Sequence, residues 1–121
     1  MMYDNNNIFA KILRGEIPCK KIYEDEYVLS FYDINPQKKI HALVIPKGKY
    51  IDLDDFNVKA SDKEIVGLMK GISIVAKKLG ISLDVGKGYR TLSNLSEHGG
   101  QEVPHLHFHL FGGEKVGRMV E

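Results

Sequence analysis

The sequence has little of several features that mark specialised classes of protein. It contains one cysteine, Cys19, so no disulfide can form within the chain, which is typical of proteins in a reducing compartment. No apolar run approaches the roughly 20 residues that a membrane-spanning helix needs. The opening residues MMYDNNN are polar and acidic, unlike the basic and then apolar start of a secretory signal. These absences predict a cytoplasmic protein.

An excess of charge of one sign is also lacking. The 17 basic and 16 acidic residues give a formal net charge of +1, and no block of like charge interrupts the chain. This balance argues against both a nucleic-acid partner and a membrane surface. With 121 residues, the chain is long enough to bury a hydrophobic core, and we expect a single domain over residues 1–121.

Apolar periodicity predicts two helices. The first lies in IFAKILRGEIP (8–18), which follows the capping residues Asn5–Asn7 and is stopped by Gly15 and Pro18. The second spans residues 61–80, where Ser61 and Glu64 have the spacing of a capping box. Its expected buried stripe consists of Ile65, Leu68, Met69, Ile72, Val75, Ala76 and Leu79.

Runs rich in β-branched and aromatic residues predict five strands. Residues 22–23 and 27–32 flank a polar turn and form a hairpin, and residues 41–46 form a third strand that ends at a proline. Residues 88–95 and 103–111 supply the fourth and fifth. Because helices and strands do not alternate as in parallel sheets, we expect an α+β fold with a mostly antiparallel five-stranded sheet and two helices.

Three of the five histidines lie in PHLHFHLFGG, at positions 105, 107 and 109. Alternate residues of a strand point to one face, so His105, His107 and His109 would share a face, and the apolar residues between them would face the core. Imidazole is poorly suited to a core unless its nitrogens are hydrogen-bonded. Three aligned rings therefore indicate a functional site.

This pattern leaves three interpretations. The histidines are a solvated sheet face, or part of a metal site that needs a third ligand, or groups for nucleophilic or acid–base chemistry. The segment that follows holds Gly112-Gly113 rather than a ligand, which disfavours the metal. Gly99-Gly100, with the amides of Asn94 and Gln101, precedes the histidines and is typical of a phosphate cradle. The third interpretation, with phosphoryl chemistry, is favoured.

These residues also resemble a known family. His105 to Leu110 match the histidine-triad pattern, in which histidine alternates with an apolar residue. IFAKILRGEIP, FYDINPQ (31–37), HALVIPK (41–47) and NLSEHGGQEVPHLHFHLFGG (94–113) have the order and spacing of its nucleotide-binding branch. The resemblance covers roughly residues 8–119 and is greatest to the bacterial members.

The resemblance implies a homodimer whose two sheets join into one. Its expected ligands are purine nucleoside monophosphates, and its expected activity is hydrolysis of nucleoside phosphoramidates and acyl nucleotidylates, with neither metal nor another cofactor. Two alternatives remain, which are hydrolysis of dinucleoside polyphosphates and a nucleotide-binding regulatory module with little turnover.

The resemblance also implies roles for residues of this chain. His107 would be the nucleophile, His109 would contact the phosphate, His105 and His41 would support them, and Asp33 would bind the ribose hydroxyls. The base would lie against Ile8, Phe9, Ile17, Phe31 and Ile34. The remaining nucleotide-binding residues would be Asn94, Gly100, Gln101, Glu102 and Phe108. Animal members usually have serine at the position of Glu102, whose carboxylate would repel a phosphate if it pointed inward.

Overall fold

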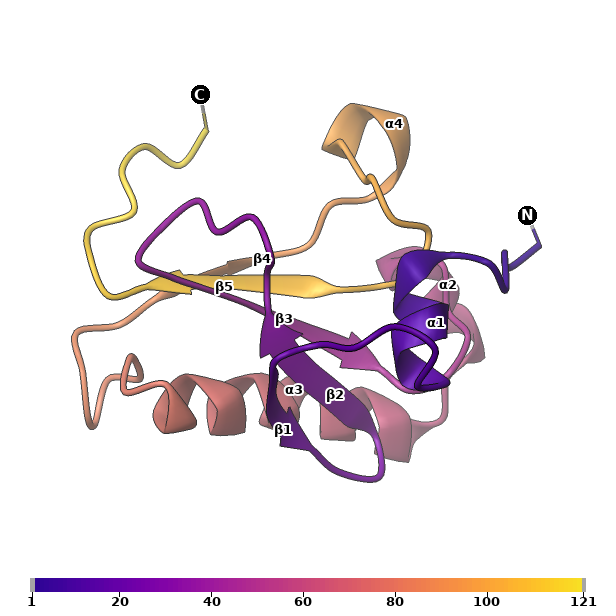
Figure 1. Ribbon diagram of the computed structural model, residues 1–121, viewed down its shortest axis with the longest axis horizontal. Coiled ribbons are helices and arrows are strands. Elements are labelled where there is room, and N and C mark those ends of the chain that lie inside the picture. The colour runs from indigo at the N-terminus through magenta and orange to yellow at the C-terminus, as the bar shows by residue number, and fades with distance from the viewer. Residues whose placement is uncertain (1, 121) are drawn as a thin grey trace.

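The computed structural model describes residues 2–120, which form one antiparallel sheet and four helices. This confirms the α+β class, and Figure 1 shows α3 along one face of the sheet with α4 on the opposite side. In chain order, the elements are α1 (Ile8–Leu13), β1 (Lys21–Glu24), β2 (Val28–Tyr32), β3 (Ile40–Pro46), α2 (Leu53–Lys59), α3 (Asp62–Lys78), β4 (Arg90–Leu92), α4 (Ser96–Gly99) and β5 (Phe108–Gly112).

The five strands have the spatial order β1-β2-β3-β5-β4, and each neighbouring pair is antiparallel. The predicted hairpin is present as β1 and β2. Strand β3 lies at the centre, where Leu43 pairs with His109 and His41 pairs with Phe111 of β5. This register places the end of the histidine motif beside the strand that carries a fourth histidine.

Helix α3 covers one face of the sheet. The predicted capping box is present, since the Ser61 side chain accepts the backbone N–H of Glu64 and the Glu64 carboxylate accepts the backbone N–H of Ser61. Gly67 allows a close approach, because a Cβ added there would lie 2.6 Å from the Tyr27 ring. Leu68 of α3 is fully buried and packs in the core cluster with sheet residues such as Val28 and Val44.

Helix α1 covers part of the opposite face. Asn7 caps it by accepting the backbone N–H of Ala10, and the buried Phe9 ring packs edge-on against Phe31 at 5.6 Å between centroids. The apolar cluster on this face consists of Phe9, Leu29, Phe31, Leu43 and Ile45. The face is thus only partly filled by apolar residues, and the rest of it carries histidines.

Three expectations from the sequence need correction. The short helices α2 and α4 were not predicted, because neither has a long apolar stripe. Met69 is 49% exposed rather than part of the buried stripe of α3. Strand β4 spans Arg90–Leu92 rather than residues 88–95, and β5 begins at Phe108 rather than at residue 103. β5 begins late because its ladder with β3 starts at the pair of Phe108 with Val44, and the preceding segment bonds elsewhere.

Within residues 2–120, no helix has both the length and the apolar character needed to cross a membrane.

Candidate active site

Two of the three motif histidines precede strand β5. The segment 103–107 bends at residues 103–105 and lies outside the β3 ladder, and the N–H of Leu106 instead donates to the carbonyl of Tyr50, with N and O 2.8 Å apart. The carbonyl of His107 accepts the Ser93 hydroxyl at 2.8 Å. The motif is therefore held by Ser93, which follows β4, and by the loop after β3 as well as by the sheet, and each histidine has a different environment.

His105 is completely buried behind the site. Its Nε2 lies 2.9 Å from the carbonyl oxygen of Pro46, and its Nδ1 lies 2.5 Å from the Tyr3 hydroxyl. Because a carbonyl can only accept, Nε2 carries the ring proton and Nδ1 accepts from the Tyr3 hydroxyl. Burial lowers the pKa of His105 to about 4, so the ring is neutral at pH 7.

His107 is held in the opposite tautomer. Its Nδ1 lies 2.7 Å from the carbonyl oxygen of His105, so Nδ1 carries the proton and Nε2 keeps an unprotonated lone pair. The Phe9 ring meets it edge-on with centroids 5.0 Å apart. Burial lowers the pKa of His107, although the charges of Asp33 and Glu102 act against this. The ring is thus a neutral base or nucleophile at pH 7.

A chain of hydrogen bonds sets the tautomer of His109. The backbone N–H of Gln37 donates to Nδ1 of His41 across 3.2 Å, so Nε2 of His41 carries its proton. That nitrogen lies 2.9 Å from Nδ1 of His109, which must then accept, leaving the proton of His109 on Nε2. The Phe111 ring stacks on His109 at 5.7 Å between centroids and 3° between planes. His109 is accordingly a fixed N–H donor.

The surroundings of His41 and His109 also determine the pKa values of these two rings. Burial lowers the pKa of His109 to about 4, with smaller contributions from His107 and His41. Burial also lowers the pKa of His41, and the nearby Asp33 carboxylate partly offsets this. The Oδ2 of Asp33 lies 3.5 Å from Nε2 of His41. The buried rings of His41, His105 and His107 and the half-buried ring of His109 are therefore neutral at pH 7, as an uncharged nucleophile requires.

The carboxylate of Asp33 with His41 and His109 forms the group best placed to hold a metal ion, with one potential ligand atom from each within 4.8 Å of the others. This supplies the third ligand that the metal interpretation needs. A metal, however, binds an unprotonated ring nitrogen, whereas Nε2 of His41 carries the proton that His109 accepts. The hydrogen bonds favour a fixed donor chain over a metal site.

A cavity of about 370 Å³ lies in front of His107 and His109. It is lined by Phe9, Asp33, Gln37, Leu43, Leu92, Asn94, Gly100, Glu102, Val103, His107, His109 and Phe111. The predicted site residues Phe9, Asp33, Asn94, Gly100, Glu102, His107 and His109 are thus brought together. The structure adds Gln37, Leu43, Leu92, Val103 and Phe111. The alternation of β5 contained a signal for Phe111, because it lies two residues after His109 and shares its face.

Other predicted site residues do not line this cavity. Ile34 is 85% exposed and Ile8 is 41% exposed, while Phe31 is buried beneath Phe9. Phe108 points to the opposite face of the sheet, where it packs against the core below α3. Ile17 is half-buried and also lies outside the lining. Contacts of these residues with a base remain predictions.

Gln101 has a different role from the one expected. Its amide nitrogen donates to the carbonyls of Ile51 at 2.7 Å and Val103 at 3.0 Å, and its amide oxygen accepts the N–H of Ser96 at 3.0 Å. The side chain therefore hydrogen-bonds within the protein and does not line the cavity, and its contact with a ligand remains a prediction. It ties the loop that carries Gly100, whose φ of 74° suits glycine, to the loop after β3.

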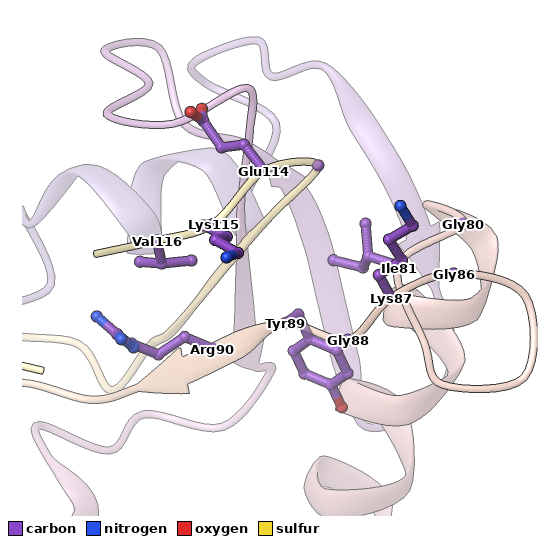
Figure 2. Close-up of a pocket in the computed structure, with 11 residues that line it drawn as sticks. Gly80, Ile81, Gly86, Lys87, Gly88, Tyr89, Arg90, Glu114, Lys115 and Val116 are labelled. Atoms are coloured by element: carbon purple, nitrogen blue, oxygen red, sulfur yellow. The ribbon is translucent and has the colours of Figure 1, made fainter. Parts of the chain in front are cut away.

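A larger cavity of about 750 Å³ lies away from the histidines, between residues 80–90 and the C-terminal segment (Figure 2). Two of its charged groups bond to the protein. The Arg90 guanidinium donates to the carbonyls of Arg118 at 2.7 Å and Gly117 at 2.9 Å, and the Glu114 carboxylate accepts the N–H of Lys39 at 2.7 Å. Although it is the larger space, no histidine lines it, so the histidine cavity is the candidate active site.

Known proteins share this sequence and architecture. The profile of the HIT domain family matches residues 14–116. An uncharacterized 13.2 kDa HIT-like protein of Azospirillum brasilense is 54% identical over 118 residues, covering 98% of this chain and 94% of the relative.

Solved structures of other proteins have the same fold. A HIT family hydrolase from Clostridium thermocellum superposes with a TM-score of 0.86 at 36% identity, covering 98% of this chain and 99% of the other. A histidine triad nucleotide-binding protein from Candida albicans gives a TM-score of 0.75 at 34% identity, covering 87% of this chain and 73% of the other. Motif, fold and these similarities agree, and the chain belongs to the HIT family.

Proposed function

We propose that this protein hydrolyses purine nucleoside phosphoramidates and acyl nucleotidylates through a covalent nucleotidyl-His107 intermediate. The observation that carries the proposal is the hydrogen bond from Nδ1–H of His107 to the carbonyl of His105, at 2.7 Å. It keeps the lone pair of Nε2 free in a residue that lines the cavity. A neutral imidazole oriented in this way is a competent nucleophile at pH 7.

In the first step, Nε2 of His107 attacks phosphorus and forms a P–N bond. The bond from phosphorus to the leaving group breaks with its electron pair on the amine nitrogen or acyl oxygen. An amine leaving group also takes up a proton from solvent water, and the water that attacks in the second step returns one to the solvent. The ring of His107, bonded at both nitrogens, becomes cationic, and the carbonyl of His105 stabilises the remaining N–H.

In the second step, water attacks the same phosphorus and the P–N bond to His107 breaks, with its electron pair returning to Nε2. The products are a nucleoside monophosphate and neutral His107. His109 supports both steps as a donor, because its Nε2–H is fixed by the bond of Nδ1 to His41. We place this N–H on a phosphoryl oxygen, where negative charge increases in each transition state.

The rest of the cavity suits the other parts of a nucleotide. Asp33 already uses Oδ1 to accept the N–H of Asn35 at 2.8 Å, which fixes the carboxylate for ribose hydroxyls. Asn94 is held through its amide nitrogen, which donates to the carbonyl of Gly99 at 2.7 Å, so its oxygen is oriented. The Phe9 ring offers an apolar wall for a purine. We propose these contacts of Asp33, Asn94 and Phe9 together with the reaction.

The proposal also includes a homodimer in which a second sheet continues this one. The available edge on the β5 side is β4, whose three residues pair with β5 on one side alone. A strand edge with unpaired backbone groups favours addition of another strand.

The proposal is tested with adenosine phosphoramidate as substrate. His107→Ala is expected to lower kcat by about 10⁴-fold or more, because the nucleophile is removed. His98→Ala is the matched control, since His98 is an exposed histidine of α4 that the cavity does not include. Mass spectrometry of the quenched wild-type reaction should locate the nucleotidyl group on His107.

Other results would contradict the proposal. An adduct on another residue would reassign the nucleophile, and turnover retained in His107→Ala would reject the mechanism. Binding of adenosine monophosphate by a wild-type protein that turns over no phosphoramidate would indicate a binding module instead.

A further inference from the structure

The N-terminal segment reaches the histidine motif through one side chain, Tyr3. Its hydroxyl oxygen lies 2.5 Å from Nδ1 of His105, and the two rings meet edge-on with centroids 5.6 Å apart. Burial raises the pKa of the Tyr3 phenol, so the hydroxyl keeps its proton at pH 7. The proton is donated to His105, because Nε2 of that ring already donates to the carbonyl of Pro46.

Tyr3 is anchored rather than loosely placed. The next residue, Asp4, accepts at its backbone carbonyl from both the backbone N–H of Asn7 at 3.2 Å and its side-chain amide at 2.7 Å. The Asn7 side-chain oxygen in turn accepts the N–H of Ala10 at 2.9 Å and so begins α1. Asn7 is 5% exposed. Tyr3 is thereby tied to α1, whose Phe9 ring contacts both His105 and His107.

The contact matters because His105 orients His107 through its own backbone. The carbonyl of His105 accepts Nδ1–H of His107 and so selects the tautomer of that ring. The His105 ring is held at both nitrogens, by Tyr3 on one side and Pro46 on the other. Without the hydroxyl, a fully buried Nδ1 would lose its donor, which is costly and favours movement of the ring or uptake of a proton.

We propose that Tyr3 is a positioning residue of the active site, whose hydroxyl holds His105 neutral and in place so that the His105 carbonyl aims His107 at phosphorus. The role of Tyr3 in turnover rests on the proposed function. The geometric part, control of the His105 ring by Tyr3, stands without it.

The effect on protonation follows from what surrounds His105. Tyr3 from the N-terminal segment and His107 from the motif are the titratable groups that act on it, together with the Pro46 carbonyl of β3 and the Phe9 ring of α1. A donor to Nδ1 stabilises the neutral ring. Removal of this donor makes Nδ1 easier to protonate, so the pKa of His105 rises and a positive charge is placed behind His107 at a higher pH.

The experiment uses Tyr3→Phe in the full chain, which removes the hydroxyl and keeps the ring. Tyr23→Phe is the matched control, since its hydroxyl donates to Asp25 at 2.8 Å in the β1–β2 hairpin. For adenosine phosphoramidate, we expect Tyr3→Phe to lower kcat about tenfold with KM little changed. The acid limb of its kcat–pH profile should move to higher pH, and NMR should find the titration of His105 moved in the same direction.

Three outcomes would overturn the inference. The first is a His105 titration that Tyr3→Phe leaves unchanged. The second is an equal loss of kcat in Tyr23→Phe. The third is a loss of kcat with an unshifted pH profile, which is the result expected of a merely structural contact. If the wild-type protein does not turn over the substrate, the proposed function fails, and the NMR titration of His105 alone decides whether Tyr3 controls this ring.

Discussion

The two faces of the sheet are built from the same strands but serve different purposes. In β3, Ala42 and Val44 point to the face under α3, whereas Leu43 points to the face with the cavity. In β5, Leu110 lies in the α3 core and His109 lines the cavity. One face is therefore closed by apolar packing, and the other combines a small apolar cluster with four hydrogen-bonded imidazoles.

The two faces therefore have separate roles, one in the stability of the fold and the other in its chemistry. The α3 face excludes water and supplies most of the apolar burial that drives folding. The cavity face keeps its polar groups satisfied instead, and every buried side-chain nitrogen or oxygen of residues 2–120 has a hydrogen-bond partner. Strands held rigidly from one side can thus present reactive rings from the other. The comparison can be tested by disturbing each face separately.

The largest expected effect comes from the α3 face. Leu68→Ala removes a fully buried side chain and should lower the free energy of unfolding by about 2–5 kcal/mol, because a cavity remains in the core. Val66→Ala, on the exposed side of the same helix at 49% exposure, should change it by about 0.5 kcal/mol or less. Urea denaturation measures both. Turnover per folded molecule should stay unchanged, and a selective loss of kcat in Leu68→Ala would break the separation.

The cavity face should contribute a pH dependence of stability. His105 in the folded protein binds a proton near pH 4, whereas an unfolded histidine does so near pH 6.5. Between these values the unfolded state holds more protons, so the free energy of unfolding falls as the pH is lowered from about 6.5 to 4, by about 2 kcal/mol for this ring. Urea denaturation between pH 4 and 7 measures the effect, and stability independent of pH over this range would contradict it.

A smaller effect is expected from the donor chain behind His109. His41→Phe keeps a ring against Phe111 but removes the donor to Nδ1 of His109, so the tautomer of His109 is no longer fixed. We expect kcat for adenosine phosphoramidate to fall about tenfold. His41→Gln retains a side-chain N–H and should recover part of the loss. Steady-state kinetics measure the change in kcat, and the ¹⁵N shifts of His109 report its tautomer. Equal kcat for His41→Phe and wild type would show that the hydrogen bond from His41 to His109 has no part in the mechanism.

The sequence predicted the elements with strong local signals. The capping box at Ser61 and the glycine after α1 marked the helix boundaries, and the β1–β2 hairpin followed from apolar runs around a polar turn. Helices α2 and α4 were missed because they lack an apolar stripe, since α2 buries Phe56 alone and α4 buries no side chain.

The candidate site was likewise predicted in part from the sequence and missed in part. Alternation correctly predicted that His107 and His109 share a cavity, yet it placed His105 and His107 in the strand, which begins only at Phe108. The Tyr3 contact joins residues 102 positions apart, and the His41 contact joins residues 68 apart, so neither has a local signal. Gln101 was expected to face the ligand because its amide suits phosphate, but the carbonyls of Ile51 and Val103 take it instead.

The sequence by itself determined which chemical groups are available and roughly where they lie, because side-chain type, alternation along a strand and helix caps are local properties. Only the tertiary structure decided which nitrogen of His105 and of His109 carries the proton. That assignment depends on acceptors and donors contributed by Pro46, by the backbone of Gln37 and by Tyr3, which the fold brings to the motif from distant parts of the chain.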